Sequence, residues 1–434
     1  MSPTPDPFAA IAQPLGWCYL AFAAANAAAA YKAGRRRLGL AAAWTAVGAA
    51  FCWLGIRSVA GHPVGLPEGL KDAIDATLGP VTLTLASFGL LAALYGFREK
   101  LVRPAWAWAG LNTAVAFLGL SLVDADFAAI VLKPDNVAIA AMIFLLGFFT
   151  WLGASQAVEN DRRKERGEQT VEADFREKTL VWPDLVYIEL IAMVILSAVL
   201  LAWSIVLKAP LEQPANPVVT PNPAKAPWYF LGLQEMLVFF DPTIAGVVIP
   251  LLIIVGLAAI PYLDRNPKGS GYYTIAERKF AHAVFLFGFL QLWILLIVIG
   301  VFFRGPNWNF YGLYQTRDPH LLIAQNNSKL SELVWLAALE RPTPQVDPPV
   351  RPGFAAIVLR ELPGLVVLAL YFVALPMILA RTRLKWLRVE LGRFKYCFTA
   401  FLLLMMLALP LKMLLRWTAN ISYIVSFPEW FVGF

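Results

Sequence analysis

The residues best suited to chemistry lie between two long apolar segments, in the stretch 208–242. Prolines recur up to Pro227 and exclude a regular helix there, and the aromatic run Trp228, Tyr229 and Phe230 follows directly. Because proline is favoured in the first turn of a helix, we expect a short helix to begin at this point. An aromatic helix of this kind either caps a pocket for an apolar ligand or anchors the chain in the membrane interface.

Two carboxylates accompany the aromatic run. Glu235 lies eight residues after Pro227, slightly more than two helical turns, so we expect both to share roughly one face. A carboxylate in an apolar pocket has a raised pKa, which suits a proton acceptor near neutral pH. Asp241 ends the helix and could accept a proton at longer range. The alternatives are an ion pair of Glu235 with Lys225 or with a partner subunit, and a cap or turn role for Asp241.

The elements that position these residues are predicted to be membrane helices. Hydrophobic types make up 59% of the 434 residues, charged types only 15%, and the mean hydropathy is +0.63. Soluble domains carry about 25% charged residues, so the composition excludes an ordinary soluble protein. We expect an all-α integral membrane protein with about ten transmembrane helices, at 11–31, 39–58, 76–96, 105–122, 137–157, 184–207, 243–263, 281–303, 355–380 and 396–416.

Basic residues predict the orientation of these spans. Every second loop between the predicted spans is rich in basic residues: the loops at 32–38, 97–103, 158–180, 264–280 and 381–395. Together these five loops hold 23 of the 36 Lys and Arg residues. The positive-inside rule puts these loops in the cytoplasm. Both termini and the helix after Pro227 then lie on the outer side of a bacterial-type inner (cytoplasmic) membrane.

The chain divides into five predicted regions. These are a five-span N-terminal membrane region (1–157), a charged cytoplasmic linker (158–180), a region carrying the proline-rich loop (181–303), an external loop (304–354), and two further spans with an external tail (355–434). We interpret the N-terminal region as a packing and docking module. The external loop is long enough to serve as a docking surface for an electron carrier or another partner.

Charged residues inside predicted membrane spans are costly and often mark functional sites. Glu189 lies inside the sixth span and is a candidate for proton uptake on the inner side. Lys412 and Arg416, near the outer end of the last span, are expected to extend toward the interface.

Metal ligands are scarce in this sequence. It has three cysteines, with no CxxC or CxxCH pattern, which excludes a covalent haem motif, a classical zinc site and a disulfide framework. The three histidines, His62, His282 and His320, are too few for a pair of bis-histidine haems. We expect no metal held by this chain.

The region 182–303 resembles the C-terminal half of cytochrome b, a separate subunit IV where that protein is split. The entry of the first helix of that half is similar to residues 182–190, WPDLVYIEL. The loop that ends in the Pro-Glu-Trp-Tyr signature of the family is similar to residues 214–230, PANP…PWYF. GVVIPLLIIVGLAAIPYLDRNP at 246–267 resembles the next helix, and the span at 281–303 follows as expected. The resemblance covers under a third of the chain, after an unassigned multi-span region.

The resemblance implies a quinone pocket, lined by Pro227, Trp228, Tyr229, Phe230, Glu235 and Phe239. In the family, the loop glutamate accepts a proton while electrons divide between an iron–sulfur protein and haem b. Pro227 occupies that position here, and proline accepts no proton. Glu235 and Asp241 are therefore the candidate catalytic substitutes.

The implied function is that of a quinone-pocket subunit of a quinol:electron-acceptor oxidoreductase, which is not catalytic alone. Its partners would be a haem-bearing cytochrome b-type subunit, an iron–sulfur subunit and a c-type cytochrome, so that haem b and the iron–sulfur cluster belong to partners. Membrane lipid surrounds the chain, and no nucleic acid is expected. One alternative, favoured by Pro227, is a structural scaffold of a respiratory supercomplex without quinol turnover. Another is a membrane transporter, which the concentration of prolines in an external loop disfavours.

Overall fold

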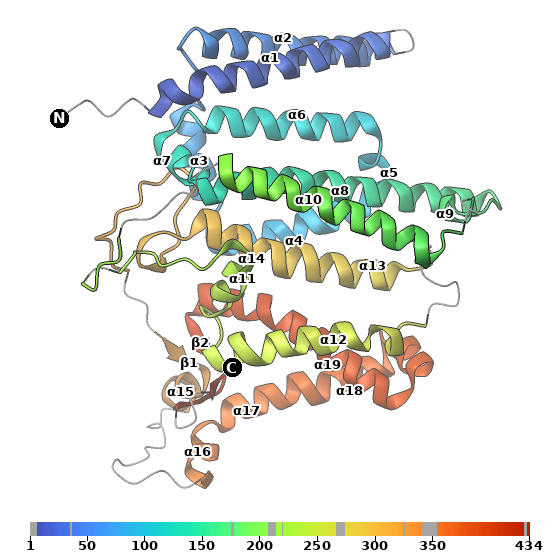
Figure 1. The fold of residues 1–434 in the computed structure, drawn as a ribbon. Helices are drawn as coiled ribbons and strands as arrows, with labels where there is room; N and C mark the ends of the chain where they lie inside the picture. The colour runs from blue at the N-terminus through green and yellow to red at the C-terminus, as the bar shows by residue number, and fades with distance from the viewer. Residues whose placement is uncertain are drawn as a thin grey trace.

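The computed structural model describes residues 7–34, 37–174, 178–206, 214–218, 220–265, 274–323, 327–339, 354–428 and 432–434. Long helices run side by side through most of the molecule (Figure 1). Among the described residues, seven helices are long and apolar enough to cross a membrane, or up to nine if each of two bent pairs is one span. The predicted all-α membrane fold is confirmed, whereas the count of about ten spans stays a prediction.

The N-terminal helices begin with a hairpin at the edge of the bundle (Figure 1). Prolines stand at the first position of three later helices, where the missing N–H leaves no hydrogen bond unmade. The elements are α1 (Pro7–Gly34), α2 (Leu38–Val59), α3 (Glu68–Thr77), α4 (Pro80–Gly96), α5 (Arg98–Leu101), α6 (Pro104–Ser121), α7 (Ala125–Val131), α8 (Pro134–Glu165) and α9 (Val171–Asp174). The chain bends by 85° between α3 and α4 and by 115° between α6 and α7.

The C-terminal elements include longer spans interrupted by π-helical turns. The stretch Val181–Val206 contains α10 (Val186–Val206), Ile244–Leu263 contains α12 (Ile249–Leu263), and Lys279–Phe303 contains α13 (Lys279–Leu286) and α14 (Leu295–Val298). The others are α11 (Trp228–Met236), α15 (Leu330–Leu333), α16 (Phe354–Arg360), α17 (Leu362–Ala369), α18 (Leu375–Arg381) and α19 (Lys385–Ala419). Short strand β1 (Ser328–Lys329) pairs in parallel with β2 (Ile421–Tyr423), and β3 (Ser426–Phe427) pairs antiparallel with β4 (Val432–Gly433).

A break in α19 explains the difference between its length and the predicted span at 396–416. Gly392 has a φ of 75°, in the left-handed region that favours glycine. The residues before it belong to the basic segment predicted to be cytoplasmic, and the apolar span follows it. The stretch α19 therefore consists of two helical segments that meet at Gly392, a short basic one and a long apolar one.

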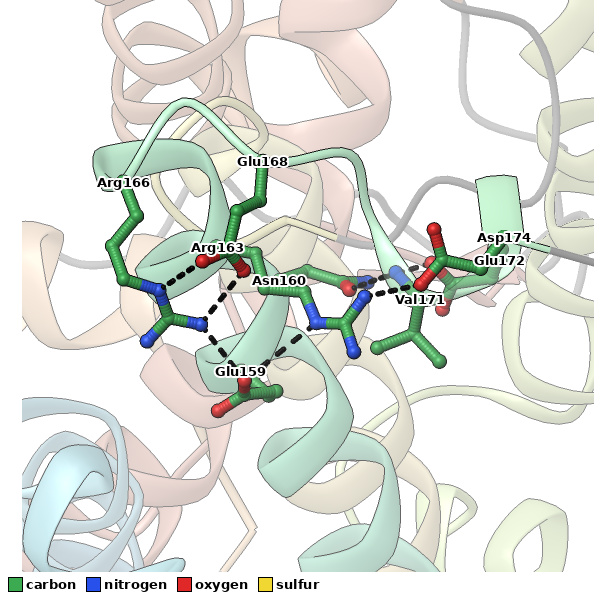
Figure 2. A network of polar contacts seen from close by, with 8 residues as sticks. All are labelled: Glu159, Asn160, Arg163, Arg166, Glu168, Val171, Glu172 and Asp174. Atoms are coloured by element: carbon green, nitrogen blue, oxygen red, sulfur yellow. Dashed lines mark hydrogen bonds and ion pairs between the residues drawn. The ribbon is translucent and has the colours of Figure 1, made fainter.

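Residues 159–174 of the charged linker are held together by polar contacts among their own side chains and backbone (Figure 2). The helix α8 extends to Glu165, and the chain then turns back so that the Asn160 side chain accepts from the backbone N–H of Val171 at 2.9 Å and donates to Glu172 at 2.8 Å. Asp161 accepts from the backbone N–H of Ala276 at 3.0 Å. The linker is thus tied to the loop before α13.

The N-terminal region also packs against the rest of the chain. Helix α4 contacts the middle of the 279–303 span and α19, and the Gln291 side chain donates to Ser87 at 2.5 Å. At the end of the bundle that carries α11, Tyr314 shares a hydrogen bond of 2.7 Å with Ser121, and its backbone N–H donates to Asp75 at 3.1 Å. The first part of the predicted external loop therefore docks within the chain. Residues 324–326 and 340–353 of that loop lie outside the described residues.

Candidate functional site

The short helix predicted after Pro227 is present as α11. Pro227 precedes it in an extended conformation, with φ of −51° and ψ of 147°. The side chain of Gln234 folds back over the helix start, accepting from the N–H of Ala226 and donating to the carbonyl of Ala224, both at 2.8 Å. The proline-rich segment and a glutamine side chain together fix where this helix begins.

One side of α11 is buried against the 279–303 span. Leu231, Gly232, Glu235 and Met236 are buried on this side. Gly232 faces Trp293, Leu296 and Ile297 of that span at ordinary packing distances, so a small residue there fits the contact without strain. The helix is therefore held in place by packing with an adjacent membrane span.

The opposite side of α11 presents aromatic rings. Tyr229 and Phe230 are 50% and 51% exposed, and their ring centres lie 4.7 Å apart. Trp228 is half-buried, packs against the main core and makes an edge contact with Tyr229 at 5.7 Å. The predicted aromatic set thus forms one contiguous surface at the start of α11, and Pro227 beside it is exposed.

Glu235 has a different environment from Pro227. Its carboxylate is 0% exposed and accepts from Arg304, at 2.6 Å from Nη2 and 2.9 Å from Nε. Arg304, 3% exposed, also donates from Nη1 to the carbonyl of Trp308 at 2.8 Å. Burial raises the pKa of the Glu235 carboxyl, while the positive charge and hydrogen bonds of Arg304 oppose that rise. Glu235 is buried and Pro227 is exposed, so these two residues do not share a face of α11. The partner of Glu235 within the chain is Arg304, which the sequence did not indicate.

The remaining candidates are dispersed. Asp241 is half-buried, and its carbonyl accepts from the N–H groups of Ile244 and Ala245 at 2.9 Å, which starts the next helical segment. Phe239 is buried and packs edge-on against Trp417 at 5.4 Å. Glu189 is exposed in the first turn of α10.

A cavity of about 350 Å³ lies beyond the C-terminal end of α11. Residues 237–240, 307–309 and 422–423 line it together with Arg304, Leu322, Ile323, Asn327 and Arg416. Of the predicted quinone contacts, Phe239 lines this cavity. Trp228, Tyr229 and Phe230 do not, so the exposed aromatic surface and the cavity are separate features.

The expectation that Lys412 and Arg416 extend outward is wrong. Lys412 is 1% exposed and donates to the carbonyl of Ser422 at 2.5 Å, and Arg416 is 8% exposed. The segment that contains β2 folds back over the end of α19 and supplies the oxygens that these cations bind. Residues after the last span therefore bury charges that would otherwise reach water.

The three histidines lie apart and do not form a pair that could ligate one haem from both sides. His62 and His320 are exposed in loops, and His282 is half-buried on α13, so no two of them face each other from neighbouring helices. In the described part of the chain, no group of three or more His, Cys, Asp or Glu residues could hold a metal ion.

These features describe an α-helical, multi-span membrane protein with an aromatic interhelical loop helix. Residues 214–316 match the family of the cytochrome b C-terminal region, b6 and petD, which confirms the resemblance for that segment. A cytochrome b of Allochromatium vinosum is 37% identical over 90 residues, which is 20% of this chain and 22% of that relative. No solved structure matches the chain. The matched segment contains α11 and Arg304, while the motif at 182–190 lies before it.

Proposed function

We propose that this chain is the quinone-pocket subunit of a membrane quinol:electron-acceptor oxidoreductase. The observation that carries the proposal is the match of residues 214–316 to the cytochrome b C-terminal family, which supports a membrane electron-transfer function of the cytochrome b type. The aromatic helix α11 lies inside this match. Electrons would leave through haem and iron–sulfur centres of partner subunits.

The exposed aromatic surface supports a pocket that is completed by a partner. Tyr229 and Phe230 offer two adjacent rings for contact with a quinone ring. Helix α10 has no buried residue, so within the described structure its apolar surface is left for lipid or a partner subunit. A haem-bearing subunit covering this side would close the pocket and bring the electron acceptor near the quinol.

Quinol oxidation also needs a proton acceptor, and the two candidate carboxylates differ in access. Glu235 must first exchange its hydrogen bonds with Arg304, because both carboxylate oxygens accept from that guanidinium. Asp241 is half-buried rather than buried, and its Oδ1 accepts only a long hydrogen bond of 3.4 Å from the N–H of Thr243 among the described contacts. We propose Asp241 as the proton exit and Glu235 as an acceptor that acts only after its ion pair rearranges.

A scaffold without quinol turnover is the second candidate. Two observations favour it: Pro227 stands where the family signature has glutamate, and Glu235 is held in a buried ion pair. On this hypothesis the aromatic surface contacts a partner subunit instead of a quinone.

The test uses the gently purified assembly and a quinol analogue. Tyr229→Ala and Phe230→Ala should weaken analogue binding by about tenfold each, because each removes exposed aromatic area that the bound analogue would cover. Trp53→Ala is the matched control, since Trp53 is 56% exposed on the N-terminal hairpin. Unchanged analogue binding in both variants, with an intact assembly, would support the scaffold instead.

A further inference from the structure

A short basic segment precedes the apolar part of α19. Gly392 separates the helical residues 385–391 from the long apolar helix that follows. The stretch 381–395, which contains this segment, holds six Lys or Arg residues and a single acidic residue, Glu390. The entry to the last membrane span therefore carries a concentrated positive charge.

Most of this charge has no partner within the chain. The amine of Lys395 donates to the carbonyl of Tyr262 at 2.8 Å. In the described structure, the other five basic side chains lie within hydrogen-bond or ion-pair distance of no residue: Arg381, Arg383, Lys385, Arg388 and Arg393. Arg388 is half-buried and the other four are exposed. Their guanidinium and ammonium donors are therefore available to an anion from outside the chain.

The segment is held in place by one apolar side. Leu387 and Leu391 are buried in a cluster with Ala380 of α18 and Tyr396. The hydroxyl of Tyr396 donates to the carbonyl of Pro376 at 2.8 Å. Packing against α18 therefore fixes which side of the segment faces outward.

The outward side also carries apolar residues among the cations. Val389 is 76% exposed and Phe394 is 86% exposed. Trp386 is half-exposed and makes an edge contact at 5.5 Å with Phe280, at the start of the 279–303 span. Exposed apolar side chains beside free cations are typical of a helix in the membrane interface, where the apolar groups enter the acyl region and the cations meet lipid phosphates.

We propose that the segment 381–395 binds the headgroup of an anionic phospholipid through its five unpaired cations, while Val389 and Phe394 enter the acyl layer. Free phosphate shares the headgroup chemistry but would leave these two apolar side chains in water. Lipid is favoured over an acidic segment of a partner, because the stretch continues directly into a membrane span and headgroups lie beside it in any bilayer. The proposal is independent of quinone binding, since 381–395 lies outside the matched residues 214–316.

The test places the whole chain in phosphatidylcholine nanodiscs that contain a small fraction of photoreactive phosphatidylglycerol. We expect adducts on the peptide that contains residues 385–395, and few adducts there from photoreactive phosphatidylcholine. Arg383→Gln/Lys385→Gln/Arg393→Gln should reduce the phosphatidylglycerol adducts by about tenfold, because an anionic headgroup is attracted to each cation near the membrane surface. All three side chains are exposed, so these changes leave the packed side of the segment intact.

A control variant removes the same charge from other exposed positions. Lys32→Gln/Arg37→Gln/Arg103→Gln should leave labelling of the 385–395 peptide unchanged. Equal loss in the two triple variants, or equal labelling by the two lipids, would overturn the proposal.

Two further outcomes would replace the lipid with another ligand. Val389→Ser/Phe394→Ser should reduce labelling severalfold if the lipid is the ligand. Displacement by inorganic phosphate, with no effect of this double variant, would overturn the lipid assignment in favour of free phosphate. Crosslinking of this peptide to a subunit of the intact assembly, without lipid adducts, would overturn it in favour of an acidic partner.

Discussion

Two ionisable side chains near α11 are withdrawn from solvent by different means. The negative charge of Glu235 is balanced by Arg304. The Lys225 amine donates to the carbonyl of Val301 at 2.9 Å and has no carboxylate within ion-pair distance in the described structure. Burial lowers the pKa of Lys225 to about 7, and the nearby Arg317 and Lys133 add to this. The surroundings of α11 therefore contain a buried ion pair, Glu235 with Arg304, and the amine of Lys225, whose pKa is about 7.

The pair formed by Glu235 and Arg304 is expected to be costly to break. Arg304→Gln leaves a buried carboxylate without its counter-charge, so we expect a loss of about 3–5 kcal/mol in the free energy of unfolding. The double variant Glu235→Gln/Arg304→Gln should recover much of that loss. Denaturation in detergent measures both, and equal destabilisation of the single and double variants would contradict the account.

Lys225 predicts a pH dependence of stability. Its pKa is about 7 in the fold against 10.5 normally, so the unfolded chain binds more protons between these values. Stability should therefore rise as pH increases from about 7 toward 10.5. Lys225→Met should flatten this rise in thermal unfolding midpoints, and Lys32→Met, at an exposed lysine of the N-terminal hairpin, should not. A rise of the same slope in Lys225→Met would exclude this amine as its source.

At the scale of elements, patterns within short stretches of sequence were enough to predict the start of α11 and most apolar helices. The prolines before Trp228 left few other conformations, and each span is long enough to be recognised alone. The partner of Glu235 was not predictable, because Arg304 is 69 residues away and meets it only when α11 packs on the 279–303 span. Burial of Lys412 was missed for a different reason: Ser422 is only 10 residues away, but it reaches the amine through a chain reversal after α19.

The docking of the 304–323 segment on α3 gives an element-scale prediction. The Asp75 carboxylate accepts from the backbone N–H of Tyr314, and Gly312 approaches it so closely that a Cβ would overlap. Asp75→Ala should release this segment and raise its hydrogen exchange or proteolysis severalfold. Asp72→Ala, on the same helix, is the control. Full protection of 304–323 in Asp75→Ala would show that the segment is held by other contacts.

At the scale of the whole molecule, the proposed function requires redox centres from partner subunits. Its three histidines do not fit a bis-histidine haem, yet residues 214–316 match a family of electron-transfer membrane proteins. The helices α10 and α12 have no buried residues, and the aromatic surface of α11 is half-exposed. We expect haem absorbance in the purified assembly to follow a partner subunit and to be lost when the chain is isolated from it.

The most direct measurement is photo-crosslinking of an azido-quinone to the intact assembly, followed by peptide mapping. The account predicts adducts on the peptide that contains Trp228, Tyr229 and Phe230, displaced by excess quinol and lost in a Tyr229→Ala/Phe230→Ala variant. Labelling confined to other segments, or labelling of this peptide that the double variant and excess quinol leave unchanged, would contradict it.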